Sequence, residues 1–453
     1  MAAEAKKLPQ YFAAVSICIG AMGTGTVIGW TSNISDELTD GSLNNIKLDL
    51  SWAGAIMCLG AMCTCIPIGI LADKIGRKLC VLFTIIPFII GWVLIILTKH
   101  VAMFLVGRFL TGFAGGSFCI VGPLYTSETS QKEIRGTLGT FMQLFITIGI
   151  LFSNGLGWAL DVLYFSIMCA IVPAVFGILF VFQPESPIYL LKKGKKDRAL
   201  KAYQRLRGSE YDPSEEVGEI EKHVAKEEEL KGQFWTTLKT KPGWKSSIIC
   251  FSLMFYQQLS GINAVMFYSG AIFKDAASSV QSELCVTIVG AVQVVATVFS
   301  SWSVEKLGRK VLLMVSAGVM ALSTLLMGIY FLLKDKELVD EETIKSIGWL
   351  PLLALTLFII AFSFGYGPIP WLASAEIFPP AIMAMMSSLA GMFNWFCAFI
   401  VAVGYEPLSK AVGSYVTFFI FTIISATAVF FVLIVMPETK GKTFQEIQEE
   451  LAK

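Results

Sequence analysis

Long apolar stretches alternate with short polar connections along almost the whole chain. Each stretch reaches about 20 residues, the length at which an α-helix crosses a lipid bilayer. They begin near Tyr11, Trp52, Leu79, Val101, Gly136 and Leu163, and then near Trp244, Glu283, Val311, Gly348, Ala381 and Val412. A polar insert from about Glu185 to Lys241 separates the two sets. The pattern predicts an all-α membrane protein with twelve transmembrane helices, in two six-helix halves joined by a cytoplasmic helical insert.

The same pattern divides the chain into four parts. We expect an N-terminal six-helix half at 1–184, a cytoplasmic helical linker at 185–243, a C-terminal six-helix half at 244–436 and a cytoplasmic tail at 437–453. An even number of spans places both termini on one side. Basic residues collect on that side: Lys6, Lys7, Lys74, Arg77, Lys78, Arg135, the cluster from Lys192 to Arg207, Lys306, Arg309 and Lys310. Because cytoplasmic loops carry an excess of lysine and arginine, both termini should be cytoplasmic.

Composition narrows the function classes. Hydrophobic residues make up 55% of the 453 residues and charged residues only 15%, which is typical of an integral membrane protein whose partner is the lipid bilayer. A net charge of +1 argues against a nucleic-acid partner. The cysteines fall mostly in apolar runs, and no metal-ligand set or phosphate-binding loop is present, so we expect no metal and no cofactor. No obligate protein partner is implied, and an enzyme is the least favoured class.

Polar side chains are concentrated in the apolar run from about Ile248 to Phe273. Gln257, Gln258 and Asn263 would point in directions of about 0°, 100° and 240° around a regular helix. They could face one cavity only if the helix breaks, and Ser260-Gly261 is the expected place. Amides at an interrupted helix are typical of a transporter's substrate site, and they match a ligand rich in hydroxyl groups. The alternative is that they join packed helices.

An internal repeat supports a transporter with two related halves. Ala72-Asp73-Lys74-Ile75-Gly76-Arg77-Lys78 recurs as Val304-Glu305-Lys306-Leu307-Gly308-Arg309-Lys310. A cytoplasmic location explains the basic residues of both segments, but it explains neither the glycines nor the acids that precede the lysines. Parallel repeats of this kind place a substrate site between two halves that rock against each other.

Taken together, these segments resemble the sugar-porter branch of the major facilitator superfamily over nearly the whole chain. Besides the two repeated loops, the resemblance rests on Gly107-Arg108-Phe109, Pro184-Glu185-Ser186-Pro187, Gln257 to Asn263, Gly367-Pro368-Ile369-Pro370-Trp371 and Pro437-Glu438-Thr439-Lys440-Gly441. Within this branch the chain is most similar to insect facilitated trehalose and glucose transporters, partly through Phe273-Lys274-Asp275-Ala276.

The resemblance implies a set of sugar-binding residues. It assigns sugar hydroxyls to Gln143, Gln257, Gln258, Asn263, Trp371 and Asn394, and it places Gln293 where mammalian glucose transporters usually have asparagine. Ser363 and Ala398 stand where an acid and a second asparagine are usual. Gln293 carries a longer amide than asparagine, and Ser363 and Ala398 are smaller than the residues usual at their positions. These differences change the shape of the pocket, so both glucose-type hexoses and trehalose remain open as substrates.

The mode of energy coupling is predicted from span one. Proton-coupled members of the family carry an aspartate there, opposite the span-four arginine, which is Arg108 in this chain. The stretch from Tyr11 to Thr31 contains no Asp or Glu. We therefore predict a facilitative uniporter in which Arg108 is a helix-packing donor. A proton symporter that uses another acid, and a transporter-like sugar sensor, are the alternatives.

Charged residues near the predicted helix ends suggest a cytoplasmic latch. Arg77, Glu128, Arg135 and Glu185 in the first half, and Arg309, Glu376 and Glu438 in the second, are expected to pair when the inner gate is shut and to part when it opens. The arginines that the family usually carries after the span-ten glutamate and after Pro187 are missing. With fewer charge pairs to hold the inner gate shut, we expect the protein to favour inward-open states. Asn33-Ile34-Ser35 is an external glycosylation sequon, and the plasma membrane is the expected location.

Overall fold

The computed structural model describes residues 5–43, 46–229, 232–276, 281–442 and 444–452. Within these residues, 12 helical segments are long and apolar enough to cross a membrane, which confirms the predicted fold class. The first six are α1 (Leu8–Ser32), α3 (Leu50–Ile75), α4 (Arg77–Ile96), α5 (Val101–Thr129), α6 (Lys132–Ala159) and α7 (Val162–Phe180).

Two of the remaining spans are interrupted. Span seven consists of α12 (Lys241–Gln257), the π-helical turn η1 (Gln258–Ile262) and α13 (Asn263–Asp275). Span ten consists of α17 (Leu350–Phe364) and α18 (Ile369–Ile377). The other four spans are α14 (Ser282–Leu307), α15 (Arg309–Asp335), α19 (Pro380–Val412) and α20 (Ser414–Val435).

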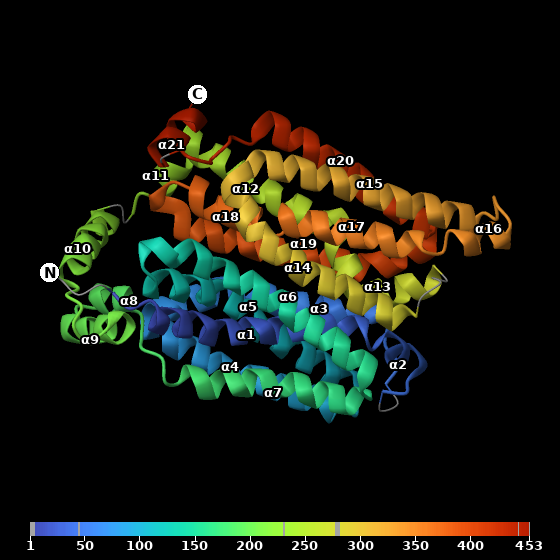
Figure 1. Ribbon diagram of the computed structural model, residues 1–453, viewed down its shortest axis with the longest axis horizontal. Coiled ribbons are helices and arrows are strands. Elements are labelled where there is room, and N and C mark those ends of the chain that lie inside the picture. The colour runs from blue at the N-terminus through green and yellow to red at the C-terminus, as the bar shows by residue number, and fades with distance from the viewer. Residues whose placement is uncertain (1–4, 44–45, 230–231, 277–280, 443, 453) are drawn as a thin grey trace.

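The short helices lie at the two ends of the bundle. One end carries α8 (Pro187–Lys192), α9 (Lys196–Arg207), α10 (Ser214–Glu229), α11 (Phe234–Leu238) and α21 (Phe444–Ala452), together with both termini (Figure 1). The opposite end carries α2 (Ser35–Asp40) and α16 (Glu341–Ser346). The insert after span six is therefore helical, and it lies at the same end of the bundle as the C-terminal tail.

The first six spans lie together on one side of the molecule and the last six on the other (Figure 1). Close backbone contacts hold each group together. A Cβ atom added to Gly25 of α1 would lie 2.9 Å from the Cα atom of Gly149 on α6, and one added to Gly149 would lie 3.0 Å from that of Gly25. Small residues allow this approach, which matters in a bilayer because lipid and apolar side chains are equally hydrophobic.

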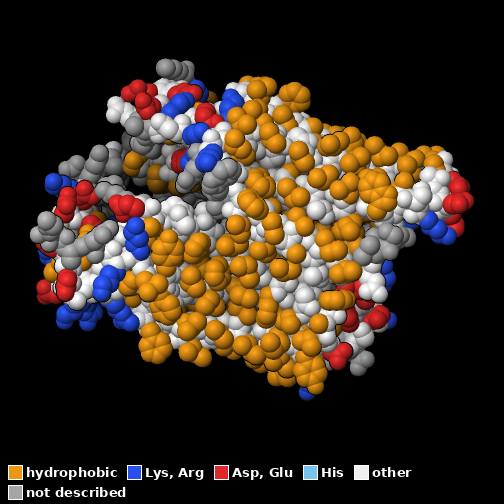
Figure 2. Space-filling view, in the orientation of Figure 1, with side chains coloured by type: hydrophobic (Ala, Val, Ile, Leu, Met, Phe, Trp, Pro, Cys, Tyr) orange, Lys and Arg blue, Asp and Glu red, His pale blue; other side chains and the backbone are white. Residues whose placement is uncertain are grey.

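The outer surface matches a bilayer. Figure 2 shows a broad apolar belt across the middle of the face in view, with charged side chains gathered at the two ends. Exposed tryptophans stand near both edges of this belt, with Trp52, Trp158 and Trp349 toward one end and Trp235 and Trp244 toward the other. Such aromatic girdles are typical of the two membrane–water interfaces.

Candidate functional site

Span seven breaks where the sequence predicts. Gly261 lies inside η1 with a φ of 98°, a backbone conformation that residues with a side chain rarely adopt. A Cβ atom at this position would also lie 2.7 Å from the ring of Phe421. The expected break at Ser260-Gly261 is confirmed, and its form is a π-helical turn. Turns of this kind inside α-helices are frequent at functional sites.

The break brings four predicted amides into one cluster. Gln258 Nε2 donates to Asn394 Oδ1 at 2.7 Å, and Asn394 Nδ2 donates to Gln257 Oε1 at 2.6 Å. Asn263 Nδ2 donates to Gln258 Oε1. The cluster therefore runs from Gln257 through Asn394 and Gln258 to Asn263, and it joins both sides of the span-seven break to α19.

Gln257 also connects the two interrupted spans. Its Nε2 donates to the carbonyl oxygens of Tyr366 and Gly367 at 2.6 and 2.9 Å. These carbonyls lie between α17 and α18, where the helical ladder of span ten is broken. Gln257 is only 3% exposed, so its amide needs partners inside the protein. The sequence did not reveal this bond, although the glycine and prolines of Gly367 to Pro370 mark the break.

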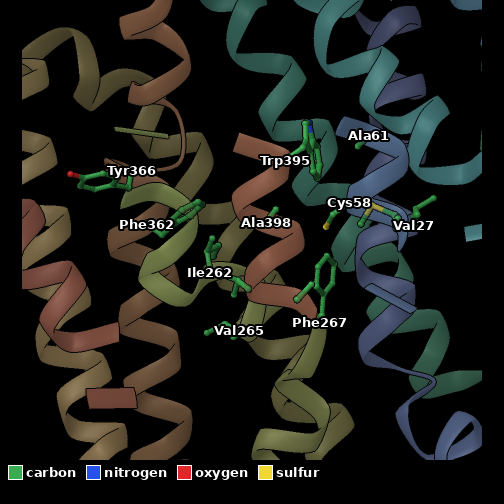
Figure 3. Packing of buried hydrophobic residues seen from close by; sticks show 14 of the residues in the cluster. Val27, Cys58, Ala61, Ile262, Val265, Phe267, Phe362, Tyr366, Trp395 and Ala398 are labelled. Carbon is green, nitrogen blue, oxygen red and sulfur yellow. The ribbon is translucent and has the colours of Figure 1, made fainter. Parts of the chain in front are cut away.

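Apolar side chains surround the amide cluster and extend to the interface between the halves. Figure 3 shows Trp395 and Ala398 of α19 on the side facing Cys58 and Ala61 of α3. Phe267 of α13 reaches the same interface, because a Cβ atom on Gly54 of α3 would lie 2.9 Å from its ring. The cluster thus lies within the C-terminal half but next to the first one.

Trp371, Gln143 and Gln293 lie outside the hydrogen-bonded cluster. Trp371 is half-buried on α18, and a Cβ atom on Gly391 of α19 would lie 3.4 Å from its ring and 3.7 Å from Ile120 of α5. Its indole therefore lies close to the opposite half. Gln143 is half-buried on α6. Gln293 is buried on α14, and its Oε1 has no hydrogen-bond partner among the described residues.

Two residues that the sequence analysis did not single out adjoin the cluster. Met254 Sδ accepts a weak hydrogen bond from Asn394 Nδ2 at 3.4 Å. Trp395 is 9% exposed, and in the described part of the chain its Nε1 is buried without a partner. A buried indole N–H without an acceptor is a candidate donor to a ligand. Its position directly after Asn394 is the signal that could have identified it.

Arg108 bonds to backbone and hydroxyl oxygens. It is fully buried, and its guanidinium donates to Ala53 O at 2.9 Å, to Val27 O at 3.2 Å and to Thr31 Oγ1 at 2.6 Å. The guanidinium carbon lies 5.3 Å from the ring centroid of Trp30, which adds a cation–π contact. These are the contacts of a helix-packing donor that links α5 to α1 and α3.

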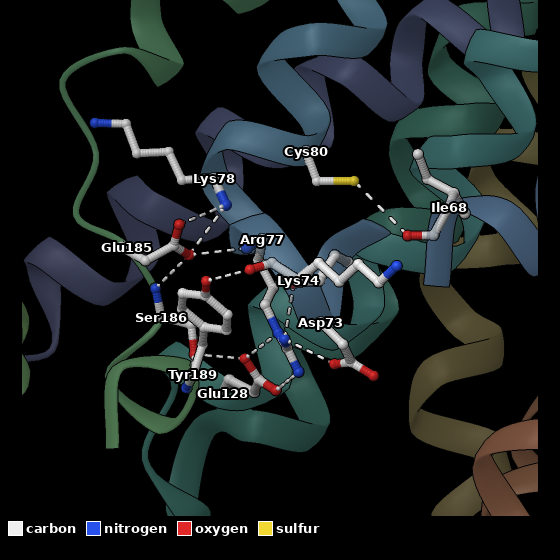
Figure 4. Close-up of polar contacts among 11 residues, drawn as sticks. Ile68, Asp73, Lys74, Arg77, Lys78, Cys80, Glu128, Glu185, Ser186 and Tyr189 are labelled. Atoms are coloured by element: carbon white, nitrogen blue, oxygen red, sulfur yellow. Dashed lines mark hydrogen bonds and ion pairs between the residues drawn. The ribbon is translucent and has the colours of Figure 1, made fainter. Parts of the chain in front are cut away.

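A charge network joins the first turn of α4 to the last turn of α5 (Figure 4). Arg77 binds Glu128 with two parallel hydrogen bonds, from Nε at 2.9 Å and from Nη2 at 2.8 Å. Ser186 Oγ donates to the same carboxylate. Glu185 accepts from the backbone N–H groups of Arg77 and Lys78, each at 3.0 Å. The segment after α7 is thereby fixed to the start of α4.

The second half repeats this arrangement. Arg309 Nη2 donates to Glu376 at 2.8 Å, and Thr439 Oγ1 donates to the other oxygen of that carboxylate at 2.7 Å. Glu438 accepts from the backbone N–H groups of Arg309 and Lys310, each at 3.0 Å. Six of the predicted latch residues therefore form two equivalent networks. The side chain of Glu305, which corresponds to Asp73, lies outside the described residues.

In this conformation these charges pair within each half, and their pairing when the inner gate is shut stays a prediction. Arg77 and Glu128 both belong to the first half, and Arg309 and Glu376 both belong to the second. Arg135, the seventh predicted member, donates only a long bond to Ser130 O at 3.4 Å among the described contacts. Each network therefore fixes the helix ends of its own half. Sequence alone could not distinguish this arrangement from pairing between halves, because both use the same residues.

Comparison with known proteins now decides the family. Residues 14–451 match the family described as sugar (and other) transporter. The chain belongs to that family. Its predicted relationship to sugar porters is confirmed.

Curated relatives agree with this assignment, and a solved structure shares the fold. The chain is 38% identical over 446 residues to the facilitated trehalose transporter Tret1 of Aedes aegypti, covering 98% of this chain and 55% of the relative. It is 37% identical to Tret1 of Culex quinquefasciatus, covering 98% of this chain and 86% of that one. The proton:xylose symporter XylE, of the major facilitator superfamily, superposes with a TM-score of 0.78 at 22% identity, over 98% of this chain and 99% of its own.

An ion pair and a hydrogen bond join the halves of this sugar-transporter family member at the end that carries α2. Lys274 of α13 forms an ion pair of 2.8 Å with Asp36 of α2. Nearby, Asn154 of α6 donates from Nδ2 to Val286 O of α14 at 3.4 Å. At the opposite end the halves separate, and a hollow opens between them (Figure 2).

Asn33 lies at the closed end and packs against the neighbouring span. Its Nδ2 donates to Gly29 O at 2.8 Å and to Asn154 Oδ1 at 3.0 Å. A Cβ atom on Gly157 would lie 2.7 Å from its side chain, so α6 covers this face of the residue. The amide of the predicted glycosylation sequon is therefore engaged in helix packing in this conformation.

Proposed function

We propose that the protein is a facilitative sugar transporter, which moves glucose-type hexoses, trehalose or both by alternating access. The observation that carries this proposal is the amide cluster of Gln257, Gln258, Asn263 and Asn394 at the broken spans. Amides offer both donors and acceptors, so they match sugar hydroxyls more closely than they match an ion. The names of the trehalose-transporter relatives support the same substrate class.

Different members of the cluster have different roles in this proposal. Gln257 holds the two breaks together through backbone carbonyls, so it positions the site. The side-chain amides of Gln258 and Asn263 bond only to other side chains among the described contacts, and they can exchange these bonds for sugar hydroxyls. Gln293 contributes an unpaired acceptor, and Trp371 contributes a ring face toward the first half. Gln143 completes the site from α6.

Uniport follows from the surroundings of Arg108. A proton symporter of this type needs a carboxylate whose protonation is linked to sugar binding. The described partners of Arg108 are two carbonyls and a hydroxyl, and α1 contains no acid. The sugar therefore moves down its own gradient in either direction.

Alternating access in this proposal uses the two halves as rigid units. The networks around Arg77 and Arg309 stabilise each half, while contacts such as Lys274 with Asp36 hold the halves together at the outer end. Opening to the outside requires that these outer contacts part. The sparse pairing between halves at the inner end supports the predicted preference for inward-open states. The basic insert supports cytoplasmic termini, and the plasma membrane is the proposed location.

The deciding experiment is counterflow in proteoliposomes that contain the full chain, using labelled glucose and labelled trehalose with and without a proton gradient. Counterflow requires alternating access but no coupled ion. We expect exchange that ignores the gradient, and loss of that exchange in Gln258→Ala. Gln204→Ala, at an exposed glutamine of α9, is the matched control and should exchange normally.

Each alternative has its own outcome in this experiment. Uptake that appears only with a proton gradient would establish the symporter. Saturable sugar binding without exchange would establish the sensor. Comparison of exchange with labelled glucose and with labelled trehalose shows whether the substrate is a hexose or a disaccharide.

A further inference from the structure

A cavity of about 530 Å³ lies in the C-terminal half, at the end of the bundle that carries the insert. It is formed by the first turns of α12, the last turn of α20 and the segment that follows it, and α21 contributes Glu450 and Leu451. The amide cluster lies farther along span seven, so this cavity is separate from the proposed sugar site. Cavities of this volume are large enough for a small organic ligand.

Two lysines give the cavity its positive charge. Lys245, Lys310 and Lys442 line it together with Glu438 and Glu450. Both acids are already engaged, because Glu450 pairs with Lys442 at 2.5 Å and Glu438 accepts backbone N–H groups. In the described part of the chain no carboxylate pairs with Lys245 or Lys310. The three lysines and two glutamates of the lining thus leave one net positive charge, and Lys245 and Lys310 form no ion pair among the described residues.

The side of the cavity toward the bilayer is apolar and open. Trp244 is 46% exposed, Ile248 47% and Ile434 78%, so these side chains face the hydrocarbon or its edge. Tryptophan at this level marks the membrane interface. A ligand that fits both sides carries negative charge at one end and hydrocarbon at the other.

The first half has a smaller cavity at the start of its own first span. There, a cavity of only about 120 Å³ lies between the start of α1 and the segment after α7. Arg205 and Leu206 from the insert line it, and Arg205 donates to Phe182 O. A short helix thus borders the cavity in each half, α9 in the first and α21 in the second, and the space left in the second half is the larger one.

We propose that the cavity in the C-terminal half binds the phosphate-bearing headgroup of an anionic membrane phospholipid. Lys245 and Lys310 bind the headgroup, and the acyl chains lie against Trp244, Ile248 and Ile434. Basic pockets between transmembrane helices on the cytoplasmic side suit such headgroups, and that leaflet holds the anionic lipids. The proposal rests on the cytoplasmic orientation proposed above and is independent of the transported sugar.

The test is native mass spectrometry of the detergent-purified full chain titrated with phosphatidylinositol, and with phosphatidylcholine as the neutral lipid. We expect retention of phosphatidylinositol by the wild type. Lys245→Gln with Lys310→Gln should weaken that binding by about 25-fold, since each basic residue near an anionic surface contributes roughly five-fold. Lys195→Gln with Lys201→Gln removes the same charge from the exposed face of α9 and should bind like the wild type.

Three results would overturn the proposal. One is equal lipid binding by the two double variants, and another is equal retention of phosphatidylcholine and phosphatidylinositol. The third is competition by glycerophosphoinositol at the same concentration as the lipid, which would identify the site as one for a soluble phosphate. Sugar-dependent thermal stabilisation of each variant reports folding. If a variant loses lipid binding but is still stabilised by sugar, the variant is folded and binds sugar. Its loss of lipid binding then cannot be caused by misfolding or by failure of the sugar proposal.

Discussion

Gln258 donates from Nε2 to Oδ1 of Asn394 at 2.7 Å across 136 positions of sequence. This bond joins the turn that breaks span seven to the middle of α19. It lies in a largely apolar interior, where an amide without a partner is costly. In the proposed function a sugar hydroxyl replaces either partner, so the two residues that stabilise the empty site would also recognise the substrate.

Removal of the Gln258 amide should therefore impair transport. We expect Gln258→Ala to lower the sugar counterflow rate roughly ten-fold or more, because an unpaired buried polar group costs about 1–3 kcal/mol. The rate per transporter at the membrane is the measurement. When Gln258→Ala is combined with Asn394→Ala, the two losses in counterflow free energy should be less than additive, since either change removes the shared bond. Fully additive losses would show that the two amides act separately.

Gly261 should tolerate no side chain. Gly261→Ala would place a Cβ atom in a left-handed backbone conformation and 2.7 Å from the Phe421 ring, so we expect a loss of about 1–3 kcal/mol in stability. The melting temperature of the purified chain measures this loss. Gly318→Ala is the control, because Gly318 lies within α15 with nothing within 4 Å of its added Cβ atom. Equal melting temperatures for both variants would contradict the role assigned to the turn.

Arg108 should matter for folding and not for proton coupling. Arg108→Gln removes the bonds that the guanidinium donates to Ala53 O, Val27 O and Thr31 Oγ1, and a hydrogen bond to a charged group contributes about 1.5–3 kcal/mol. We expect lower yield and a lower melting temperature. The variant that reaches the membrane should respond to an imposed pH gradient as the wild type does. A gradient response in the wild type that disappears in the variant would restore the symporter hypothesis.

Arg77 and Arg309, which occupy equivalent positions in the two repeats, should contribute differently to stability. The side chains of Arg77 and Glu128 are 3% and 6% exposed, whereas those of Arg309 and Glu376 are 16% and 23% exposed. Breaking a buried pair leaves a charge without compensation, which costs about 3–5 kcal/mol. Arg77→Gln should therefore lower the melting temperature more than Arg309→Gln. The reverse order would mean that burial does not govern the strength of these networks.

Glu438 should make stability depend on pH. Burial acts to raise the pKa of Glu438, but the backbone N–H groups of Lys440, Arg309 and Lys310 outweigh it and lower the pKa below its ordinary value. The stabilisation is complete above the ordinary carboxyl pKa and is lost as pH falls through the lowered pKa. The difference in melting temperature between wild type and Glu438→Gln should shrink below about pH 4. A difference that stays constant on acidification would contradict this account.

Much of the fold was predictable from the sequence, because a bilayer constrains each membrane-spanning segment separately. Every backbone polar group in hydrocarbon must bond within its own helix, so length and hydrophobicity identify the spans one by one. The break at Ser260-Gly261 was also predictable, because amides around the whole helix circumference are otherwise incompatible with one site. The residue boundaries of the two halves remain a prediction.

The partners of the polar residues belong to the tertiary structure. Sequence identified Gln257, but not that it bonds to carbonyls of span ten, because that partner lies 109 positions away. It identified Arg77 and Arg309, but not that each pairs within its own half. Local chemistry determined which groups require partners in an apolar medium, and only the packing of distant helices decided which partners they found.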